Sequence, residues 1–226
     1  MPKISILIAN FNNGHFFHDA FQSLVAQTEK DWEAIVIDDC STDNSVEIIR
    51  EFIKDDPRFR FYQNETNLGY QKTIIKGIEL SSAEIFGRLD PDDALVSDAI
   101  EESLKAHIEN PDCGLVYSNR WQCDENLEKI SITKLNQIAP FDKNFWNLRT
   151  SISHFATFKK EFYKKTSGID TYIKRAEDAD IYMKMVEIAP VKYIDKELYL
   201  YRVHPKGLST FRKCRKSPFL ALGSHY

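Results

Sequence analysis

Residues 88–95 have the sequence Arg-Leu-Asp-Pro-Asp-Asp-Ala-Leu, and this acidic stretch decides how the rest of the chain is interpreted. The apolar run before it is typical of the end of a buried strand, and Pro91, which has no N–H, predicts that the chain leaves the sheet there. Asp90 and Asp92 should then project from the carboxyl end of a strand, where oxygen ligands suit Mg²⁺ or Mn²⁺ bridged to phosphates. Taken alone, the stretch is better explained as an acidic turn before a helix cap, so the remaining motifs have to decide.

The composition is that of one globular domain, with 226 residues of which 42% are apolar and 12% aromatic. The net charge is −4, and the sequence contains no long block of residues with the same charge, so nucleic acid is not expected as a partner. The four cysteines include no C-x-x-C pair, which favours free thiols and a cytoplasmic location. No apolar run approaches the roughly 18 residues of a transmembrane span, and we expect no signal peptide from the short apolar run at 4–9.

Short β-branched runs alternate with segments of helical periodicity through the first half of the chain. Strands are predicted at 4–9, 34–37, 59–62 and 84–89, and helices at 17–25, 44–53 (capped by Asn44) and 71–80. This alternation predicts an α/β fold with a mainly parallel central sheet and helices on both faces. Ligands of such sheets bind beyond the carboxyl ends of the strands, so the polar loops after the first, second and fourth strands should converge on one crevice.

The second half of the chain has a weaker pattern. The predicted elements are a helix from Asp98, a strand at 114–118, helices at 159–165 and 178–188, and a strand at 198–203. In the first of these helices Ile100, Leu104 and Ile108 should form the buried face. Residues 120–150 have no clear periodicity and are predicted to be irregular, with one edge strand.

Four motifs then occur in order along the chain. They are SILIANFN at 5–12, VIDDCSTD at 36–43, NLG at 67–69 followed by LDPDD at 89–93, and RAEDAD at 175–180 followed by YRVHP at 201–205. In this order and spacing the chain resembles the family 2 glycosyltransferases over nearly its whole length. Each motif is weak alone, but the set is specific. The resemblance implies a single GT-A-type, Rossmann-like domain.

The resemblance implies a site for a nucleotide-diphosphate sugar, usually a UDP-sugar. Ala9 would lie at the nucleotide, Phe11 would lie against the base, and Asp39 would accept a hydrogen bond from a base N–H. Asp90 would approach the ribose. From residue type alone, Phe11 could instead be a core aromatic and Asp39 part of a turn and a helix cap.

The resemblance also implies a divalent cation, Mn²⁺ or Mg²⁺, as cofactor. Asp92 would bind this metal, with Asp93 in support. His204 and Lys206 would meet the diphosphate or its metal from the C-terminal side of the chain. The alternative for His204 is a surface residue at the end of a strand, with its hydrogen bonds satisfied.

The E-D motif of the family corresponds to Glu177 and Asp178. The resemblance implies that Asp178 is the general base and that Glu177 supports it. A base on the far side of the anomeric carbon from the diphosphate would accept the proton of the attacking hydroxyl, and the reaction would invert the configuration. The alternative is that both carboxylates only supply negative charge to the start of a helix.

The expected function is inverting transfer of a sugar to a saccharide or lipid-linked acceptor, in cell-surface polysaccharide or glycolipid assembly. Residues 1–119 would bind the donor and residues 120–204 the acceptor. Residues 205–226 would form a mobile basic tail, and this tail could bring the protein to acidic lipids at the inner face of the membrane.

Two other functions are considered. A sugar nucleotidyltransferase would need a Gly-rich phosphate loop after the first strand, where residues 10–14 contain a single glycine. A non-catalytic module that only binds sugar nucleotides would have no need for Asp92, Asp178 and His204 together.

Overall fold

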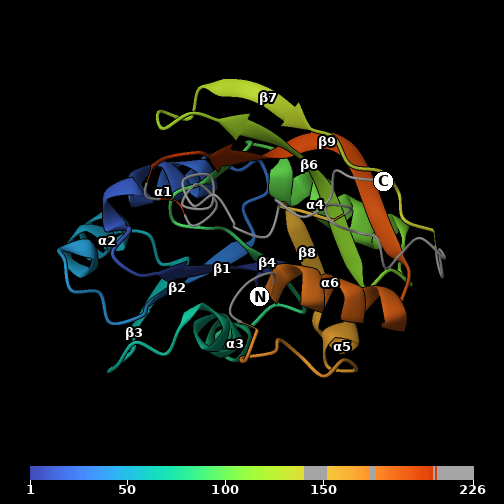
Figure 1. Ribbon diagram of the computed structural model, residues 1–226, viewed down its shortest axis with the longest axis horizontal. Helices are drawn as coiled ribbons and strands as arrows, with labels where there is room; N and C mark the ends of the chain where they lie inside the picture. The colour runs from blue at the N-terminus through green and yellow to red at the C-terminus, as the bar shows by residue number, and fades with distance from the viewer. Residues whose placement is uncertain (140–151, 174–176, 206, 208–226) are drawn as a thin grey trace, which may run out of the picture.

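In the computed structural model, which describes residues 1–139, 152–173, 177–205 and 207, nine strands form one sheet (Figure 1). The strands are β1 (Ile4–Asn10), β2 (Trp32–Asp38), β3 (Phe59–Gln63), β4 (Ile85–Arg88), β5 (Ala94–Leu95), β6 (Leu115–Cys123), β7 (Lys129–Thr133), β8 (Ala156–Lys159) and β9 (Val191–Arg202). Their order is β3-β2-β1-β4-β8-β6-β9-β5, and β7 pairs with β6.

The helices connect these strands and cover both faces of the sheet. They are the 3-10 helix η1 (Gly14–Phe16) and the α-helices α1 (Phe17–Val25), α2 (Ser45–Ile53), α3 (Tyr70–Leu80), α4 (Ala99–Glu109), α5 (Lys160–Tyr163) and α6 (Glu177–Ile188). One hydrophobic core lies between the sheet and α1, α2 and α4, and a second lies between the sheet and α3, α5 and α6. In Figure 1, α1 and α2 lie above the level of β1 and β2, whereas α3 lies below it. The predicted α/β fold with helices on both faces is therefore confirmed.

The strands β3, β2, β1 and β4 run parallel, with β3, β2 and β1 ending at the same level and β4 three residues earlier. Asn10 of β1 is opposite Asp38 of β2, and Leu7 of β1 is opposite Arg88 of β4. Side chains alternate between the two faces of a strand, and both faces of β1 and β2 are buried, which explains their continuous apolar runs. The loops after β1, β2 and β4 consequently leave the sheet at one edge.

The other part of the sheet is mixed, and the sequence pattern predicted it less well. The strand β8 is antiparallel to both β4 and β6, β9 is parallel to β6, and β5 is antiparallel to β9. The segment predicted to be irregular with one edge strand contains that edge strand, β7, and also the end of β6, which was not predicted. The short strands β5 and β8 were not predicted, because two and four residues are too few to show a periodicity.

One prediction about the helices was wrong, and a second was right in position only, because Asn44 is the N-cap residue of α2. Ile108 is 78% exposed, and His107 takes the buried position on α4, where its Nε2 atom lies 2.9 Å from the Thr157 hydroxyl. Asn44 makes no side-chain hydrogen bond at the start of α2, and the Asp43 carboxylate instead accepts one from the Ser45 N–H at 2.9 Å. In both cases a polar side chain makes a hydrogen bond that hydrophobic spacing does not indicate.

No helix within the described ranges is long and apolar enough to cross a membrane. The basic tail predicted after Pro205 lies, apart from Gly207, outside the described residues.

Candidate active site

The site begins where β1 and β2 end, at the buried carboxylate of Asp38. This carboxylate accepts hydrogen bonds from the Asn10 amide at 2.8 Å and from the Ser41 N–H and hydroxyl at 2.8 and 2.5 Å. The bonds tie the two strand ends together and fold the loop after β2 back over the edge of the sheet. Cys40 in this loop has a φ of 63°, in the left-handed region that favours tight turns.

Asp39 is buried and holds the loop that precedes α3. Its carboxylate accepts hydrogen bonds from the Asn64 amide at 2.8 Å and from the backbone N–H groups of Leu68 and Gly69, both at 2.9 Å. An ionised carboxylate has about four acceptor positions, and donors among the described residues fill three of them. Asp39 therefore holds Gly69, the N-cap residue of α3, as the alternative of a helix cap allows.

Phe11 directly follows β1 and is 46% exposed. It is not the core aromatic that its residue type alone would allow. Ala9, two residues earlier, is half-buried in β1 opposite Ile37 and packs in the core on the α3 side. The structure thus places Phe11 and Asp39 at the same edge of the sheet, after neighbouring strands.

The acidic stretch forms a turn between β4 and β5. The Asp93 N–H donates to the Asp90 carbonyl at 3.1 Å, and β5 then pairs with β9. The buried Asp93 carboxylate accepts hydrogen bonds from the Tyr199 hydroxyl at 2.8 Å and from the Arg202 N–H at 2.7 Å. Asp93 therefore anchors the turn to β9.

Asp92 meets His204 in this turn. The Asp92 Oδ2 atom lies 3.0 Å from His204 Nε2, and the His204 side chain is 4% exposed. The alternative of a surface histidine is therefore wrong. The edge of the His204 ring also packs against Phe16, with the ring centroids 4.7 Å apart.

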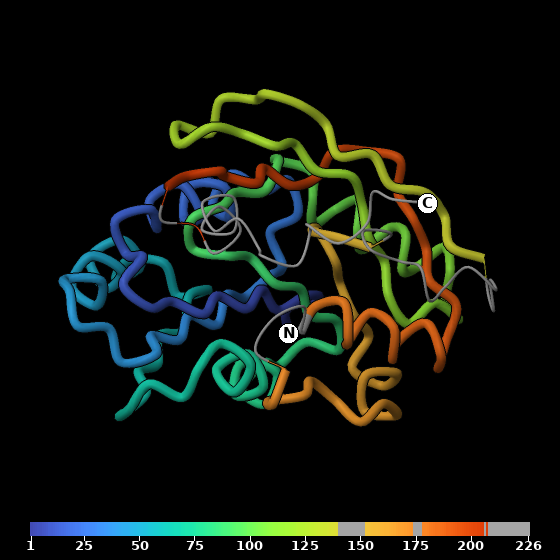
Figure 2. Tube along the Cα trace, viewed as in Figure 1, coloured from blue at the N-terminus to red at the C-terminus, as the bar shows by residue number. Residues whose placement is uncertain are grey.

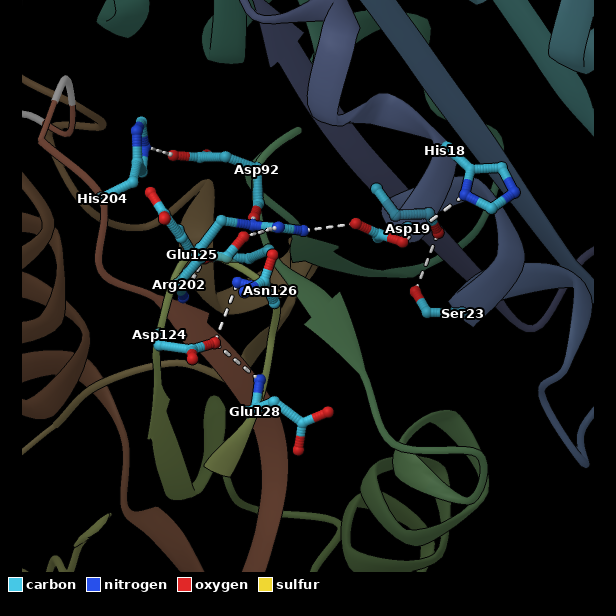
Figure 3. Close-up of polar contacts among 12 residues, drawn as sticks. His18, Asp19, Ser23, Asp92, Asp124, Glu125, Asn126, Glu128, Arg202 and His204 are labelled. Carbon is cyan, nitrogen blue, oxygen red and sulfur yellow. Dashed lines mark hydrogen bonds and ion pairs between the residues drawn. The ribbon is translucent and has the colours of Figure 1, made fainter. Parts of the chain in front are cut away.

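Arg202 fastens the acidic turn to two other parts of the chain (Figure 3). Its side chain donates hydrogen bonds to the carbonyl of Asp92 at 2.6 Å, the carbonyl of Glu125 at 2.5 Å and the carboxylate of Asp19 at 2.5 Å. Figure 2 shows the red end of β9 running beside the blue segment that contains α1. Sequence analysis did not assign Arg202 a role, although its place in the YRVHP motif, two residues before His204, was an available signal.

Asp178 lies in the first turn of α6, on the other side of the acidic turn. Its side chain is 37% exposed, and its Oδ2 atom lies 3.9 Å from Nη2 of the buried Arg88. The Arg88 guanidinium donates hydrogen bonds to the hydroxyls of Tyr70 at 3.2 Å and Tyr182 at 3.1 Å. The Tyr70 hydroxyl in turn donates to Asp90 at 3.3 Å. Sequence analysis assigned no role to Arg88. This residue connects Asp178, the predicted base, to Asp90, which is predicted to approach the ribose.

Burial and crowded negative charge determine the electrostatics of the site. Burial and the neighbouring carboxylates raise the pKa of Asp90, and they raise the pKa of Asp93 well above its ordinary value. Burial also raises the pKa of Asp178, but the Arg88 guanidinium and other basic neighbours outweigh it, so the net pKa is lowered. Burial lowers the pKa of His154, which lies beside these carboxylates, to about 4. His154 is therefore neutral at physiological pH.

The donor atoms of the site fit a metal ion that is bound together with phosphate. No group of three or more His, Cys, Asp or Glu side chains that could hold a metal occurs among the described residues. Mg²⁺ and Mn²⁺ prefer oxygen ligands, and Mg²⁺ usually takes one or two protein carboxylates while substrate phosphates and water complete its shell. Asp92 supplies one such carboxylate, and the imidazole of His204 lies next to it, with Nε2 3.0 Å from Oδ2. Lys206 and the side chain of Glu177, also predicted at the site, lie outside the described residues.

The sheet order and the polar loops at its edge define an α/β protein whose ligand site lies beyond the carboxyl ends of β1, β2 and β4. The chain belongs to glycosyl transferase family 2, whose model matches residues 5–167. It is 29% identical to an Escherichia coli chondroitin synthase over 211 residues, which cover 92% of this chain and 30% of that protein. It is 27% identical to a Pasteurella multocida hyaluronan synthase over 210 residues, which cover 92% of this chain and 21% of that protein. The chain thus spans less than a third of the length of these relatives.

Solved glycosyltransferase structures have the same fold. The crystal structure of Staphylococcus aureus TarS 1–349 in complex with UDP-GlcNAc is similar with a TM-score of 0.76 and 19% identity, over 89% of this chain and 59% of that one. The mannosyltransferase PcManGT from Pyrobaculum calidifontis in complex with GDP-Man and Mn²⁺ has a TM-score of 0.70 and 18% identity, over 93% of this chain and 60% of that one. The predicted GT-A fold is therefore confirmed.

Proposed function

We propose that this protein is an inverting glycosyltransferase that moves a sugar from a UDP-sugar to a hydroxyl acceptor, in polysaccharide or glycolipid assembly. The observation that carries the proposal is the arrangement of Asp92, His204 and Asp178 around one acidic turn at the carboxyl edge of the sheet. Membership of the family supports it, as do the chondroitin and hyaluronan synthases among the relatives. The UDP-GlcNAc complex of TarS supports a UDP-linked donor.

In this proposal the donor lies across the ends of β1, β2 and β4. Phe11 packs against the base, and the acceptor position left on Asp39 receives a base N–H, which suits uracil. Asp90 lies toward the ribose. Asp92 and His204 hold a divalent cation, Mn²⁺ or Mg²⁺, which when bound stabilises the negative charge on the departing diphosphate. The Mn²⁺ in the PcManGT complex supports this cofactor.

Asp178 is the proposed general base. Its net pKa is low, so it is ionised at neutral pH, and its side chain is 37% exposed, so an acceptor hydroxyl can reach it. Proton transfer to this carboxylate as the hydroxyl oxygen attacks makes the oxygen a better nucleophile. Attack from the side opposite the diphosphate inverts the configuration at the anomeric carbon.

A nucleotidyltransferase is disfavoured by the packing of Gly14, the single glycine in the loop after β1. The Gly14 N–H donates to the Ser45 hydroxyl at 2.9 Å, and a Cβ atom at this position would come within 2.5 Å of Ser45 Cα. The glycine therefore permits close packing of η1 on α2, and it does not open a phosphate loop.

The experiment that tests the function combines binding and turnover. Calorimetry with UDP, GDP and CDP, each with Mn²⁺ and with EDTA, should show the tightest binding for UDP with Mn²⁺. Release of UDP from a panel of UDP-sugars should then accelerate on addition of saccharide acceptors. Tight binding of a UDP-sugar without transfer or hydrolysis under any condition would instead favour a binding module.

We also propose that residues 1–119 bind the donor and residues 120–204 the acceptor, because Asp39 and Asp90 come from the first part and Asp178 from the second. The basic residues after Pro205 are proposed to bind acidic lipid at the cytoplasmic face of the membrane. Sedimentation with vesicles tests this contact. Binding to vesicles that contain phosphatidylserine, and not to neutral vesicles, is the expected result.

A further inference from the structure

Arg88, the last residue of β4, is a buried cation that has no direct carboxylate partner among the described residues. Its side chain is 4% exposed, and the nearest recorded carboxylate oxygen, on Asp178, lies 3.9 Å from Nη2. Its hydrogen bonds go to the hydroxyls of Tyr70 and Tyr182, and its Nε atom has no hydrogen-bond partner among the described residues. A buried charge is costly unless it is paired, so this arrangement calls for an explanation.

Three other partly or fully buried arginines have direct carboxylate partners. Arg60 donates to Glu33 at 3.0 Å, Arg58 to Asp56 at 2.6 Å, and Arg202 donates to a carboxylate at 2.5 Å. Direct contact of this kind is the usual way in which a protein pairs an arginine with a carboxylate. At Arg88 two tyrosine hydroxyls take the place of that carboxylate.

We propose that Arg88 is the positioning residue for the general base Asp178, oriented by Tyr182 and Tyr70 and linked through Tyr70 to Asp90 on the donor side. This inference rests on the proposed function, in which Asp178 accepts the proton of the acceptor. Arg88 itself does not touch the reacting atoms.

The separation of 3.9 Å between Arg88 and Asp178 is suited to this role. It exceeds the hydrogen-bond range, so the guanidinium does not occupy a lone pair of the carboxylate. It is still short enough for the positive charge to favour the ionised form of Asp178. The carboxylate is therefore kept charged while its oxygens stay available to an acceptor hydroxyl, which a direct ion pair would prevent.

Tyr70 extends the same network to the donor side. Its hydroxyl lies between Arg88, which donates to it, and Asp90, to which it donates. A change at the donor that displaces Asp90 is thus transmitted through Tyr70 to the guanidinium that faces Asp178.

Several titratable or charged groups besides Arg88 surround Asp178. They are His154 in the segment before β8, Arg120 on β6, Tyr182 on α6 and Asp90 in the acidic turn. His154 is neutral near pH 7, so Arg88 and Arg120 supply the positive charge. Removal of the Arg88 charge should raise the pKa of Asp178 and move the acidic limb of the pH profile to higher pH.

The test is a double-mutant cycle between Arg88 and Asp178, with transfer rates measured as a function of pH and UDP affinity measured by calorimetry. Arg88→Gln should lower kcat by about 10-fold or more and move the acidic limb upward by about one pH unit, with little change in UDP affinity. Tyr182→Phe, which removes one hydrogen bond to the guanidinium, should act in the same direction by a smaller factor. Arg60→Gln is the matched control, because it loses a partly buried arginine outside the site, and its pH profile should be unchanged.

The cycle separates this inference from the proposed function. In the Asp178→Asn background, Arg88→Gln should have almost no further effect on kcat, because residues that act through one another are not additive. Equal effects of Arg88→Gln in both backgrounds would overturn the positioning role while the base assignment stands. Asp178→Asn turnover at the parent rate would overturn the base assignment itself. If Arg88→Gln does not fold, Tyr182→Phe is measured in both backgrounds and judged by the same criterion.

Discussion

His204 Nε2 lies 3.0 Å from Asp92 Oδ2, although 112 residues separate the two in the sequence. The antiparallel pairing of β5 with β9 brings them together, because Ala94, shortly after Asp92, lies opposite Leu200, shortly before His204. Arg202 then holds the Asp92 carbonyl from the end of β9 (Figure 3). The two-residue strand β5 and Arg202 therefore bring together Asp92 and His204, the proposed metal-binding residues.

Asp92→Asn should largely abolish the dependence of UDP binding on Mn²⁺, because a neutral amide is a much weaker ligand for a divalent cation than a carboxylate. Calorimetry of UDP binding with Mn²⁺ and with EDTA measures this. Asp112→Asn, an exposed change in the loop before β6, is the control and should bind as the parent does. Equal affinity of the parent protein with EDTA and with Mn²⁺ would refute the metal site.

Asp178→Asn should lower turnover by about 10² to 10⁴ while donor affinity changes little, because the amide has the size of the carboxylate but cannot accept the proton. Asp180→Asn is the control on the same helix, where the carboxylate pairs with Lys184 at 2.6 Å. Steady-state transfer assays measure the turnover of both variants, and UDP calorimetry measures their donor affinity. A near-parental rate for Asp178→Asn would make Asp180 or His154 the next candidates for the base.

Arg202→Lys should destabilise the protein and weaken the metal site together. A lysine cannot bond simultaneously to the two carbonyls and the carboxylate that Arg202 reaches, so we expect the free energy of unfolding to fall by about 2–4 kcal/mol. For a chain of this length the melting temperature should drop by about 2–4 °C per kcal/mol. Arg50→Lys, at an exposed position on α2, should change the melting temperature by much less. Unchanged stability and unchanged Mn²⁺-dependent UDP affinity in Arg202→Lys would contradict the anchoring role.

Glu33 should contribute stability that depends on pH. Its buried carboxylate accepts hydrogen bonds from Ser5, Ser82 and Arg60. Burial opposes ionisation, but these donors outweigh it and lower the pKa from 4.5 to about 2. The folded pKa is below the unfolded one, so this stability is fully present above about pH 4.5 and is lost as the pH falls toward 2.

Glu33→Gln should therefore lower the free energy of unfolding at pH 7 by on the order of 3 kcal/mol. Between pH 4.5 and 2 the variant should lose less stability than the parent, because the group that titrates in this window has been removed. Urea unfolding at a series of pH values measures both effects. The exposed Glu47→Gln is the control, and a parent-like pH slope in Glu33→Gln would count against the assignment.

The sequence by itself determined the parallel half of the sheet and the loops that form the donor side of the site. Continuous apolar runs at β1 and β2 and helical periodicity at α1 and α3 are local patterns, and local patterns are sufficient for buried parallel strands and their crossover helices. Because parallel strands end at a common edge, the positions of Phe11, Asp39 and Asp92 at that edge followed from the same pattern.

Only the tertiary structure decided which distant side chains meet at this edge. The short strands β5 and β8 carry too few residues to be recognised, yet β5 determines that Asp92 meets His204 and that Arg202 holds the turn. Arg88 lies two residues from Asp90 in the sequence. Its guanidinium lies near Asp178 only because of the way α6 packs on the sheet. These contacts are hydrogen bonds and charge pairs between segments far apart in the chain, and hydrophobic periodicity reports only which face of a segment is buried.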